Sequence, residues 1–438
     1  MAERYNYLII GGGIAGTTAA ETIRSQDGAG SIALVEAEPH FLYSRVALPD
    51  FAAGNIPAEK LMLRRLADYE SAKIDLYLGE RIESLDLGAA EARTASGKIF
   101  IFNKVLLAGG GHPKFWPQEE GALSRVARLR TMQDAGRVRE LMEKYREVEW
   151  VNPKLGIKEK RRGKVLVVGG GLNALDLIDI FYNAGFEVTV LLRKKRFWEE
   201  HLDERGSAMF ADLWKSRGIE IFFDSEVKAI SEALDSARVL TDKGDKIIAD
   251  IVAVGVGLER NLELAKSCAL MHGVGIRVNE FMETSRKNVW AAGDAVEYPD
   301  LYSGMDKLSG SWSESFMQGK VAGFNMALND GEENKPACPA GRRVKFDTVF
   351  SYAVTHLKNH IALIGHARED VGIEAVARVR EMRGEYSRFF LKNGIMIGAI
   401  LLNGQEYLGK VVRMIRERRD LSEHKSNLAD PDFDLNKI

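Results

Sequence analysis

Short runs of aliphatic and β-branched residues, each followed by a cluster of glycines, recur along the chain. Residues 7–13 read YLIIGGG, and residues 165–171 read VLVVGGG. In both places a helical stretch comes next, and a second apolar strand follows it, at residues 31–35 and 187–192. The repeat predicts two units, each made of β-strand, glycine turn, α-helix and β-strand.

Further strand and turn elements appear in the same order after each unit. Residues 104–113 and 250–258 are expected to be strands that end in tight glycine turns. Residues 288–294 form a third element of this kind, before a helical stretch at 313–328. Strands that alternate with helices are typical of doubly wound parallel sheets with right-handed crossovers.

The pattern changes from residue 342 onward. Alternating segments predict strands there, and an amphipathic helix is expected near residues 405–418, before a polar tail that is extended or docked on a partner. A chain of 438 residues is also too long for one hydrophobic core. The predicted fold class is α/β, with two Rossmann-like doubly wound dinucleotide-binding domains plus a small α+β C-terminal interface domain.

Composition and charge exclude several classes of protein. The 61 Lys and Arg residues against 63 Asp and Glu leave no basic excess, so a nucleic-acid-binding protein is not expected. No apolar stretch reaches the roughly 20 residues that span a membrane, and the N-terminus has no cleavable leader, which indicates a cytoplasmic protein. Cys268 and Cys338 are far apart without a CxxC motif, and no His, Cys, Asp and Glu spacing indicates a metal site.

The first glycine turn carries a complete dinucleotide motif. Gly11, Gly13 and Gly16 have the GxGxxG spacing, which lets the backbone approach a pyrophosphate at a helix N-terminus. Glu36 follows 20 residues after Gly16, where a carboxylate accepts hydrogen bonds from the ribose of an adenosine. The unit is predicted to bind the ADP half of FAD through Gly11, Gly13, Ile14, Ala15, Gly16, Glu36 and Ala37.

The second glycine turn is altered in two ways. Ala174 stands at the third glycine position, and the segment 192–196, LRKKR, replaces the acidic residue. Without a carboxylate the site does not repel a 2′-phosphate, which favours NADPH over NADH, although four consecutive cations are also typical of a solvated loop. The residues predicted to bind NAD(P)H are Gly169, Gly171, Leu172, Asn173, Ala174 and Arg193.

Over residues 1 to about 420 the order of elements resembles the pyridine nucleotide-disulfide oxidoreductase superfamily. The segments 40–49, HFLYSRVALP, and 51–54, FAAG, are similar to NADH-rubredoxin reductases and to the flavin module of assimilatory nitrite reductase large subunits. The resemblance implies that Arg45 lies by the flavin and that Asp294, after Gly293, holds the ribityl chain. It also implies that the turn Ala108, Gly109 and Gly110 touches FAD.

The same resemblance implies the domain boundaries. An FAD-binding domain is expected from residues 1–115 and 259–338, and an NAD(P)-binding domain from 116–258. Residues 339–420 are expected to form a C-terminal domain that serves as a homodimer or hetero-oligomer interface over the flavin. Residues 421–438 remain as the tail.

Three departures from the family pattern matter. The segment 43–48, YSRVAL, lacks the reactive cysteine of the disulfide-using members, so no thiol relay is expected. Ala174 and Asp176 replace the usual glycine and glutamate of the second unit. A basic, Pro-containing insertion at 145–162 stands where the family has a short connection, and a partner contact is one interpretation of it.

The predicted function is hydride transfer between NAD(P)H and the flavin, with no catalytic side chain. Electrons would pass to or from a redox protein or iron-sulfur partner, such as rubredoxin or ferredoxin, with the chain either free or the flavin subunit of a larger complex. Two alternatives stay open. One is an FAD-binding docking protein similar to apoptosis-inducing factor, and the other is an oxygen-reducing NAD(P)H oxidase.

Overall fold

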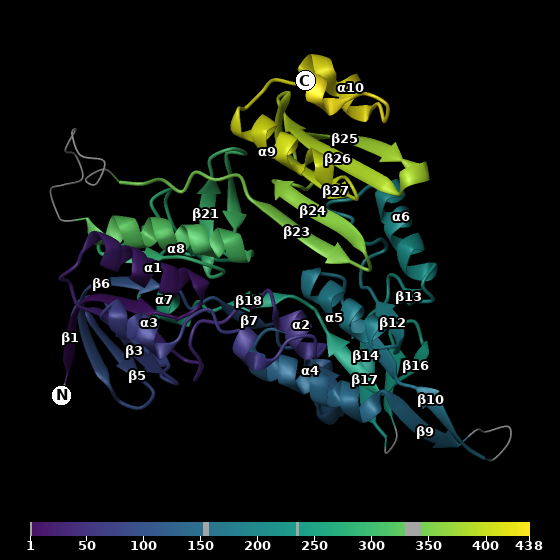
Figure 1. Ribbon diagram of the computed structural model, residues 1–438, viewed down its shortest axis with the longest axis horizontal. Coiled ribbons are helices and arrows are strands. Elements are labelled where there is room, and N and C mark those ends of the chain that lie inside the picture. Colours follow the sequence, from purple (N-terminus) through teal and green to yellow (C-terminus); the bar gives the residue numbers. More distant parts are fainter. Residues whose placement is uncertain (1, 152–156, 234–235, 329–342) are drawn as a thin grey trace. The chain divides into compact units, whose positions relative to one another are not determined.

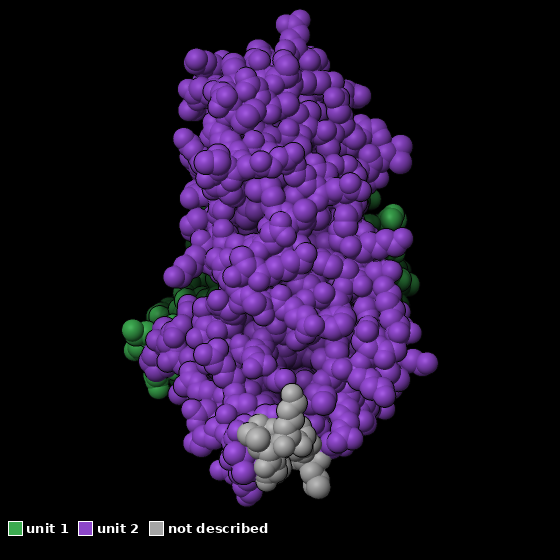
Figure 2. Space-filling model, turned by 90° about the vertical axis from the view of Figure 1, so that its right-hand side faces the viewer, with its two compact units in different colours: residues 1–46, 58–112, 259–348 green, residues 47–57, 113–258, 349–438 purple. Residues whose placement is uncertain are grey.

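The computed structural model describes residues 2–151, 157–233, 236–328 and 343–438 (Figure 1). The described chain forms two compact units, which are coloured separately in Figure 2. Unit 1 comprises residues 1–46, 58–112 and 259–348, and unit 2 comprises residues 47–57, 113–258 and 349–438. The domain boundaries expected from the sequence remain a proposal, and Cys338 lies outside the described residues.

Unit 1 contains a sheet in the order β3-β2-β1-β6-β5-β4, with β20 paired to β6. Strand β1 lies parallel to both β2 and β6, and α1 forms the crossover between β1 and β2. The central strands are buried on both faces, which explains their continuous apolar sequences. The strands of this sheet are β1 (Glu3–Ile10), β2 (Ile32–Glu36), β3 (Ile74–Leu78), β4 (Ile82–Asp86), β5 (Glu91–Thr94), β6 (Ile99–Leu107) and β20 (Val289–Ala291).

Two helices of unit 1 pack closely through glycines. Helix α1 (Ile14–Gln26) lies beside α8 (Trp312–Ala327), and a Cβ at Gly323 would come within 2.9 Å of the Cα of Ala19. A larger residue there would push the helices apart. The other elements of unit 1 are η1 (Ala58–Lys60), α3 (Leu66–Ser71), α7 (Glu263–Ser267), β19 (Ile276–Arg277), β21 (Val296–Asp300) and β22 (Met305–Leu308).

Unit 2 contains a second parallel sheet, in the order β13-β12-β11-β17-β8, together with a three-stranded antiparallel sheet. Helix α5 (Leu172–Asn183) crosses between β11 and β12, as α1 does in unit 1. The strands are β8 (Val126–Ala127), β11 (Lys164–Val168), β12 (Glu187–Leu191), β13 (Glu220–Phe222), β14 (Val227–Glu232), β15 (Ala237–Thr241), β16 (Lys246–Ala249) and β17 (Ile251–Val254). The helices are α2 (Leu48–Ala52), η2 (Pro117–Arg125), α4 (Met132–Tyr145) and α6 (Glu204–Lys215). Two short strands, β7 (Gly111–Pro113) and β18 (Leu258–Arg260), occur where the chain passes from one unit to the other.

The expected insertion at 145–162 forms an antiparallel hairpin of β9 (Glu147–Val151) and β10 (Lys158–Arg162); residues 152–156 lie outside the described residues. Its base is fixed by Asp250, which is fully buried and receives two hydrogen bonds from Arg161, at 2.6 and 2.9 Å. Asp250 also accepts the backbone N–H of Lys164 at 2.7 Å. This bidentate pair joins the hairpin to the start of β11.

The C-terminal part of unit 2 is a five-stranded antiparallel sheet in the order β23-β24-β27-β26-β25. Its elements are β23 (Ser351–His356), β24 (Asn359–Gly365), β25 (Ile373–Arg380), η3 (Glu381–Arg383), β26 (Glu385–Lys392), β27 (Ile395–Leu402), η4 (Gln405–Tyr407) and the amphipathic helix α9 (Leu408–Arg416).

The tail differs from the sequence expectation of an extended or partner-docked segment. It contains η5 (Ser422–His424), α10 (Lys425–Ala429) and η6 (Leu435–Lys437), and it packs on its own C-terminal sheet. Arg378 donates to the carbonyl oxygens of Pro431 and Phe433, at 3.0 and 2.7 Å. Four apolar tail residues are buried: Leu421, Leu428, Leu435 and Ile438.

Candidate functional site: two dinucleotide turns

The first glycine turn lies between β1 and α1 in unit 1. Gly11 has a φ of +108°, and a Cβ there would collide with the carbonyl oxygen of Ala108. Gly13 is the N-cap of α1 and offers no side-chain hydrogen bond, so the first amides of the helix point outward without a capping partner. The space around a Cβ at Gly13 is open to 4 Å. This combination fits a phosphate at the helix N-terminus.

Glu36, the last residue of β2, lies beside this turn, where the ribose is predicted to bind. Its carboxylate accepts the backbone N–H groups of Gly12, at 2.5 Å, and Glu38, at 2.8 Å. Burial raises the pKa of Glu36 above its ordinary value, although both hydrogen bonds oppose that shift. Ala37 follows at the end of β2. A half-buried acceptor in this place can bind both hydroxyls of a ribose.

Arg45 is held by two neighbours in unit 1. Its guanidinium lies 2.5 Å from Glu38, and the hydroxyl of Tyr43 donates to the same carboxylate at 2.8 Å. Burial alone lowers the pKa of Arg45, but Tyr43 and Glu38 together raise it above its ordinary value. Arg45 is therefore a fixed cation, and Glu38 is a supporting residue that the GxGxxG motif did not reveal.

The structure brings two other predicted turns to the carboxyl ends of neighbouring strands, β6 and β20. Ala108 donates its backbone N–H to Ile10, and Asn261 donates to the carbonyl oxygen of Gly109 at 2.7 Å. The chain then leaves through Gly110, whose φ is +61°. The turn 108–110 thus lies next to the first glycine turn in the same unit.

Gly293 and Asp294 follow β20 and face the start of α8. Gly293 donates its N–H to the side chain of Gln318 at 2.8 Å, and Ser315 donates to Asp294 at 3.2 Å. The Nε2 atom of Gln318 is buried and has no hydrogen-bond partner among the described residues. An unpaired buried donor beside the predicted ribityl-binding aspartate fits a bound cofactor. Sequence reasoning missed Gln318 and Ser315, which only the fold brings to Asp294.

The second glycine turn lies between β11 and α5 in unit 2. Gly169 has a φ of +111°, and Gly171 is the N-cap of α5 without a side-chain hydrogen bond, as in the first unit. The Cβ of Ala174 faces Gly255, where an added Cβ would come within 2.8 Å. The absence of a side chain at Gly255 therefore makes room for the Cβ of Ala174. Leu172 and Asn173 form the first turn of α5, beside these groups.

The ribose side of the second turn has no carboxylate. Leu192 is buried at the position that corresponds to Glu36, and its side chain covers Gly170. Arg193 is a largely exposed cation, 3.7 Å from Glu226, as the solvated-loop interpretation expects. The indole N–H of Trp198 donates to the carbonyl oxygen of Gly170 at 2.7 Å. Trp198 was not recognised from the sequence, because nothing in the motif requires it.

Asp176 lies one helical turn into α5. Burial, together with the neighbouring charge of Asp179, raises the pKa of Asp176 to about 7. Asp179 itself accepts the N–H of Leu357 at 3.0 Å and lies 3.0 Å from His356. Helix α5 thus carries a carboxyl group whose pKa is raised to about 7.

Other chemistry is limited in the described part of the chain. Its His, Cys, Asp and Glu residues form no cluster that could hold a metal ion. The thiol of Cys268 donates to the carbonyl oxygen of Leu85 at 3.0 Å, and burial raises its pKa, which makes it a poor nucleophile. No helix among these residues is long and apolar enough to cross a membrane.

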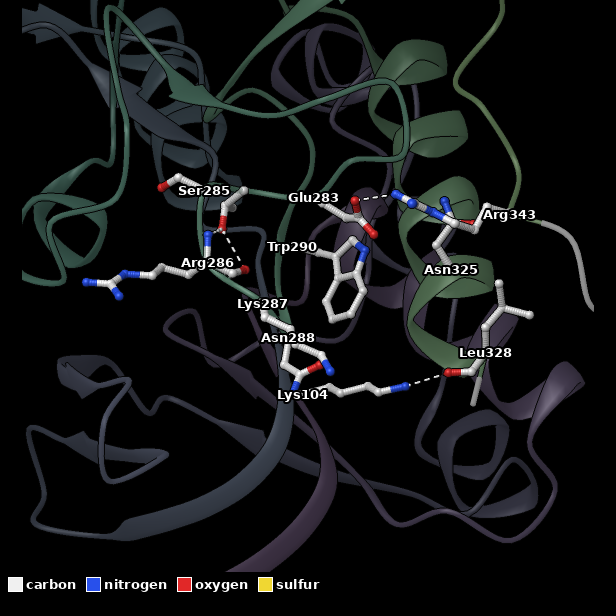
Figure 3. A pocket seen from close by; sticks show the side chains of 11 residues that line it. Lys104, Glu283, Ser285, Arg286, Lys287, Asn288, Trp290, Asn325, Leu328 and Arg343 are labelled. Atoms are coloured by element: carbon white, nitrogen blue, oxygen red, sulfur yellow. Dashed lines mark hydrogen bonds and ion pairs between the residues drawn. The ribbon is translucent and has the colours of Figure 1, made fainter. Parts of the chain in front are cut away.

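A cavity in unit 1 is separate from both glycine turns. It has a volume of about 290 Å³ and lies in unit 1 at the start of β20, whereas the Gly293 turn follows the end of that strand (Figure 3). Its walls include Trp290, Asn325 and Lys104, and Lys104 donates to the carbonyl oxygen of Leu328 at 2.7 Å. Lys104 thereby caps the C-terminus of α8, which is a structural role.

Comparison with known proteins agrees with this geometry. The family model of pyridine nucleotide-disulphide oxidoreductases matches residues 5–319. The epsilon subunit of NADH-dependent phenylglyoxylate dehydrogenase from Aromatoleum evansii is 24% identical, over 98% of this chain and 95% of that protein. The putidaredoxin reductase CamA from Pseudomonas putida is 29% identical over 67% of each chain. The assimilatory nitrate reductase electron transfer subunit of Bacillus subtilis is 21% identical, and the match covers 52% of its length.

Solved structures share the fold. The covalent putidaredoxin reductase-putidaredoxin complex matches with a TM-score of 0.85 and 22% identity, over 99% of this chain and 97% of that one. The NADH:rubredoxin oxidoreductase of Clostridium acetobutylicum matches with a TM-score of 0.76 and 20% identity over the full length of both. The predicted fold class, with two dinucleotide-binding domains, is confirmed. The chain belongs to the pyridine nucleotide-disulphide oxidoreductase family, and it is an oxidoreductase that uses FAD and NAD(P)H.

Proposed function

We propose that this chain carries electrons between NAD(P)H and an iron-sulfur redox protein or subunit, with FAD as the intermediate carrier. The observation that carries the proposal is the pair of helix N-termini without a side-chain cap, one beside the half-buried Glu36 and one without a carboxylate. Two such turns in one chain suit two different dinucleotides. The segment 43–48 has no thiol, so electrons leave the flavin directly for a partner.

The proposed ligands follow the two turns. For FAD they are Gly11, Gly13, Ile14, Ala15, Gly16, Glu36, Ala37, Arg45, Ala108, Gly109, Gly110, Gly293 and Asp294. For NAD(P)H they are Gly169, Gly171, Leu172, Asn173, Ala174 and Arg193. Glu38, Gln318 and Ser315 support the first set through the hydrogen bonds described above.

The residues of the first set would hold FAD, which would supply hydride and single-electron chemistry at this site. The protein contributes to electron transfer by orienting the bound groups and by placing charges near them. Glu36 and the amides at the start of α1 fix the ADP half, and Arg45 supplies a cation that stays charged at every physiological pH. Gln318 and Asp294 offer a donor and an acceptor on one side of the site, which suits the hydroxyl groups of a sugar-like chain.

The names of the relatives favour a complex or a carrier partner. One relative of nearly the same length is a subunit of a larger dehydrogenase, and others are ferredoxin--NAD(+) reductase components. We therefore propose that this chain is a flavin subunit or a reductase for a ferredoxin-type protein. The C-terminal sheet is the proposed surface for dimer or partner contacts, and a cytoplasmic location, to be checked by cell fractionation, is part of the proposal.

Either nicotinamide nucleotide suits the second turn. Leu192 does not repel a 2′-phosphate, which supports NADPH, whereas Arg193 and Lys194 already have acidic neighbours and the names of the relatives cite NADH and NAD(+). Anaerobic titration of the FAD-loaded protein with NADH and with NADPH compares the two directly. Rapid flavin bleaching by one of them supports the reductase, and isolation of the native protein with its co-purifying subunits identifies the partner.

The alternatives predict different results in this titration and in an aerobic assay of oxygen consumption. A docking protein similar to apoptosis-inducing factor would bleach slowly with both nucleotides. An oxygen-reducing oxidase would consume oxygen rapidly and stoichiometrically without any added carrier protein. The carrier-coupled reductase requires a ferredoxin-type protein for fast turnover.

A further inference from the structure

In each glycine turn, a side chain donates a hydrogen bond to the carbonyl oxygen of the middle glycine. The two turns use different residues for this. In the first turn the hydroxyl of Thr17, in α1, donates to the carbonyl oxygen of Gly12 at 2.9 Å. In the second turn the corresponding carbonyl belongs to Gly170, and Trp198 donates to it at 2.7 Å. The helix position that matches Thr17 is Leu175, which is buried and has no donor.

Holding this carbonyl has a direct consequence for the phosphate site. A trans peptide unit is planar, and its C=O and N–H groups point in opposite directions. When the carbonyl of Gly170 is drawn toward Trp198, the N–H of Gly171 is turned the other way. That amide belongs to the N-cap of α5, where phosphates bind in dinucleotide turns.

The indole is itself held firmly. Its ring stacks on Phe197, with centroids 4.9 Å apart and planes 19° from parallel, and Phe197 stacks on Phe210 of α6 at 4.2 Å. Phe197 and Phe210 are each only 1% exposed. Ser207 donates to the carbonyl oxygen of Phe197 at 2.7 Å. The position of Trp198 is thus fixed by the core of unit 2.

The C-terminal sheet, in the same unit, holds the residues that follow Trp198. His201 bonds through Nδ1 to the carbonyl oxygen of Ala367 at 2.5 Å, and Arg388 of β26 donates to the carbonyl oxygen of His201 at 3.2 Å. Burial lowers the pKa of His201, so its imidazole is neutral at pH 7 and its Nδ1 carries the proton for Ala367. The backbone N–H of His201 also donates to the carbonyl oxygen of Trp198 at 2.8 Å.

We propose that Trp198 is a positioning residue of the second dinucleotide turn. Trp198 has the role there that Thr17 has in the first turn, and it links the second turn to the C-terminal sheet. The identity of the ligand as NAD(P)H rests on the proposed function, but the positioning of the turn does not. Loss of the indole N–H frees the peptide between Gly170 and Gly171. The amide of Gly171 then spends less time in the direction that binds phosphate.

Three variants test this. Trp198→Phe removes the donor and keeps an aromatic ring. Trp214→Phe is the matched control, because Trp214 is fully buried in the same aromatic cluster but donates to His356, at 2.6 Å, and not to the turn. Trp198→Phe combined with Leu175→Thr restores a hydroxyl at the position that Thr17 occupies in the first turn.

Two readouts on the FAD-loaded protein separate positioning from nucleotide identity. Hydrogen exchange of the amides at 169–175 is expected to accelerate about 3- to 10-fold in Trp198→Phe, the range for one lost hydrogen bond. It should be unchanged in Trp214→Phe and should return toward the native rate in the double variant. The dissociation constants of NAD⁺ and NADP⁺ should follow the same order, with an unchanged flavin spectrum.

Equal hydrogen-exchange rates of the amides at 169–175 in Trp198→Phe and Trp214→Phe would overturn the proposal. A double variant whose exchange rate does not return toward the native rate would also overturn it. If the native protein binds neither nucleotide, the proposed function fails. The exchange measurement still decides whether Trp198 positions the turn.

Discussion

The Cβ of Ala174 occupies the space beside Gly255, so that a Cβ on Gly255 would approach it within 2.8 Å. Gly255, at the end of the facing strand β17, thus leaves room for the Cβ of Ala174. We expect Gly255→Ala to lower the free energy of unfolding by about 1–3 kcal/mol through overpacking, and to weaken nucleotide binding. Urea unfolding of the variant measures the first effect.

Two further variants make this test specific. Ala174→Gly together with Gly255→Ala should recover most of the lost stability, because the overlap is then removed. Gly136→Ala, at an open position in α4, should be neutral or slightly stabilising. An unaltered stability of the single Gly255→Ala variant would contradict the packing described here.

Glu38 holds Arg45 at the first turn, and this pair should affect flavin retention. We expect Glu38→Gln to release FAD several-fold faster, because the neutral amide holds the half-buried guanidinium less strongly. Dialysis followed by the flavin absorbance of the retained protein measures the loss. Glu83→Gln, at an exposed position of β4, is the control, and equal retention in both variants would argue against a role for Glu38.

Asp176 should make stability depend on pH. The pKa of Asp176 is about 7 in the folded protein, against an ordinary value of 3.8. Between these two pH values the carboxyl group is protonated in the folded state and ionised in the unfolded state. The free energy of unfolding therefore falls as the pH rises from about 4 to about 7. Asp176→Asn should remove this fall, and it should be more stable than the native protein above pH 7 by at most about 4 kcal/mol.

Denaturant unfolding at several pH values tests this, with Asp179→Asn as the comparison. Asp179 accepts a backbone hydrogen bond and lies beside His356, so its loss should destabilise the protein at every pH. A constant difference between Asp176→Asn and the native protein across the range would show that Asp176 does not titrate there.

The cysteines should be dispensable for electron transfer. The thiol of Cys268 is engaged with the carbonyl oxygen of Leu85, and the segment 43–48 has none. We expect the Cys268→Ala, Cys338→Ala double variant to keep its rate of flavin reduction within about twofold, a difference of less than about 0.5 kcal/mol in barrier height. Stopped-flow kinetics with NADH and NADPH measure the rate, and its collapse would indicate a thiol relay.

Much of the fold follows from local sequence. The two YLIIGGG-like turns and the strands after them are determined by apolar runs and glycine spacing, which act over a few residues. Strand β25 was not predicted, because its alternating apolar residues are interrupted by Arg378 and Arg380, which donate hydrogen bonds to the tail that covers them. The folded tail was missed for a different reason, since its four buried apolar residues are far apart in sequence.

The candidate residues of the first site follow from a short motif, whereas the residues that contact them do not. Gly11 and Glu36 belong to one short motif, whereas Gln318 reaches Gly293 only because α8 packs on α1. Trp198 reaches Gly170 across a loop, and Ala174 depends on a glycine 81 residues later. Such contacts are set by tertiary packing, which a motif does not encode.

The most direct test of the central claim is anaerobic stopped-flow mixing of the FAD-loaded protein with NADH or NADPH, followed by addition of a ferredoxin-type iron-sulfur protein. We predict rapid bleaching of the flavin by at least one nucleotide and rapid recovery of its absorbance when the oxidised iron-sulfur protein is added. A flavin that stays oxidised with both nucleotides would contradict the claim.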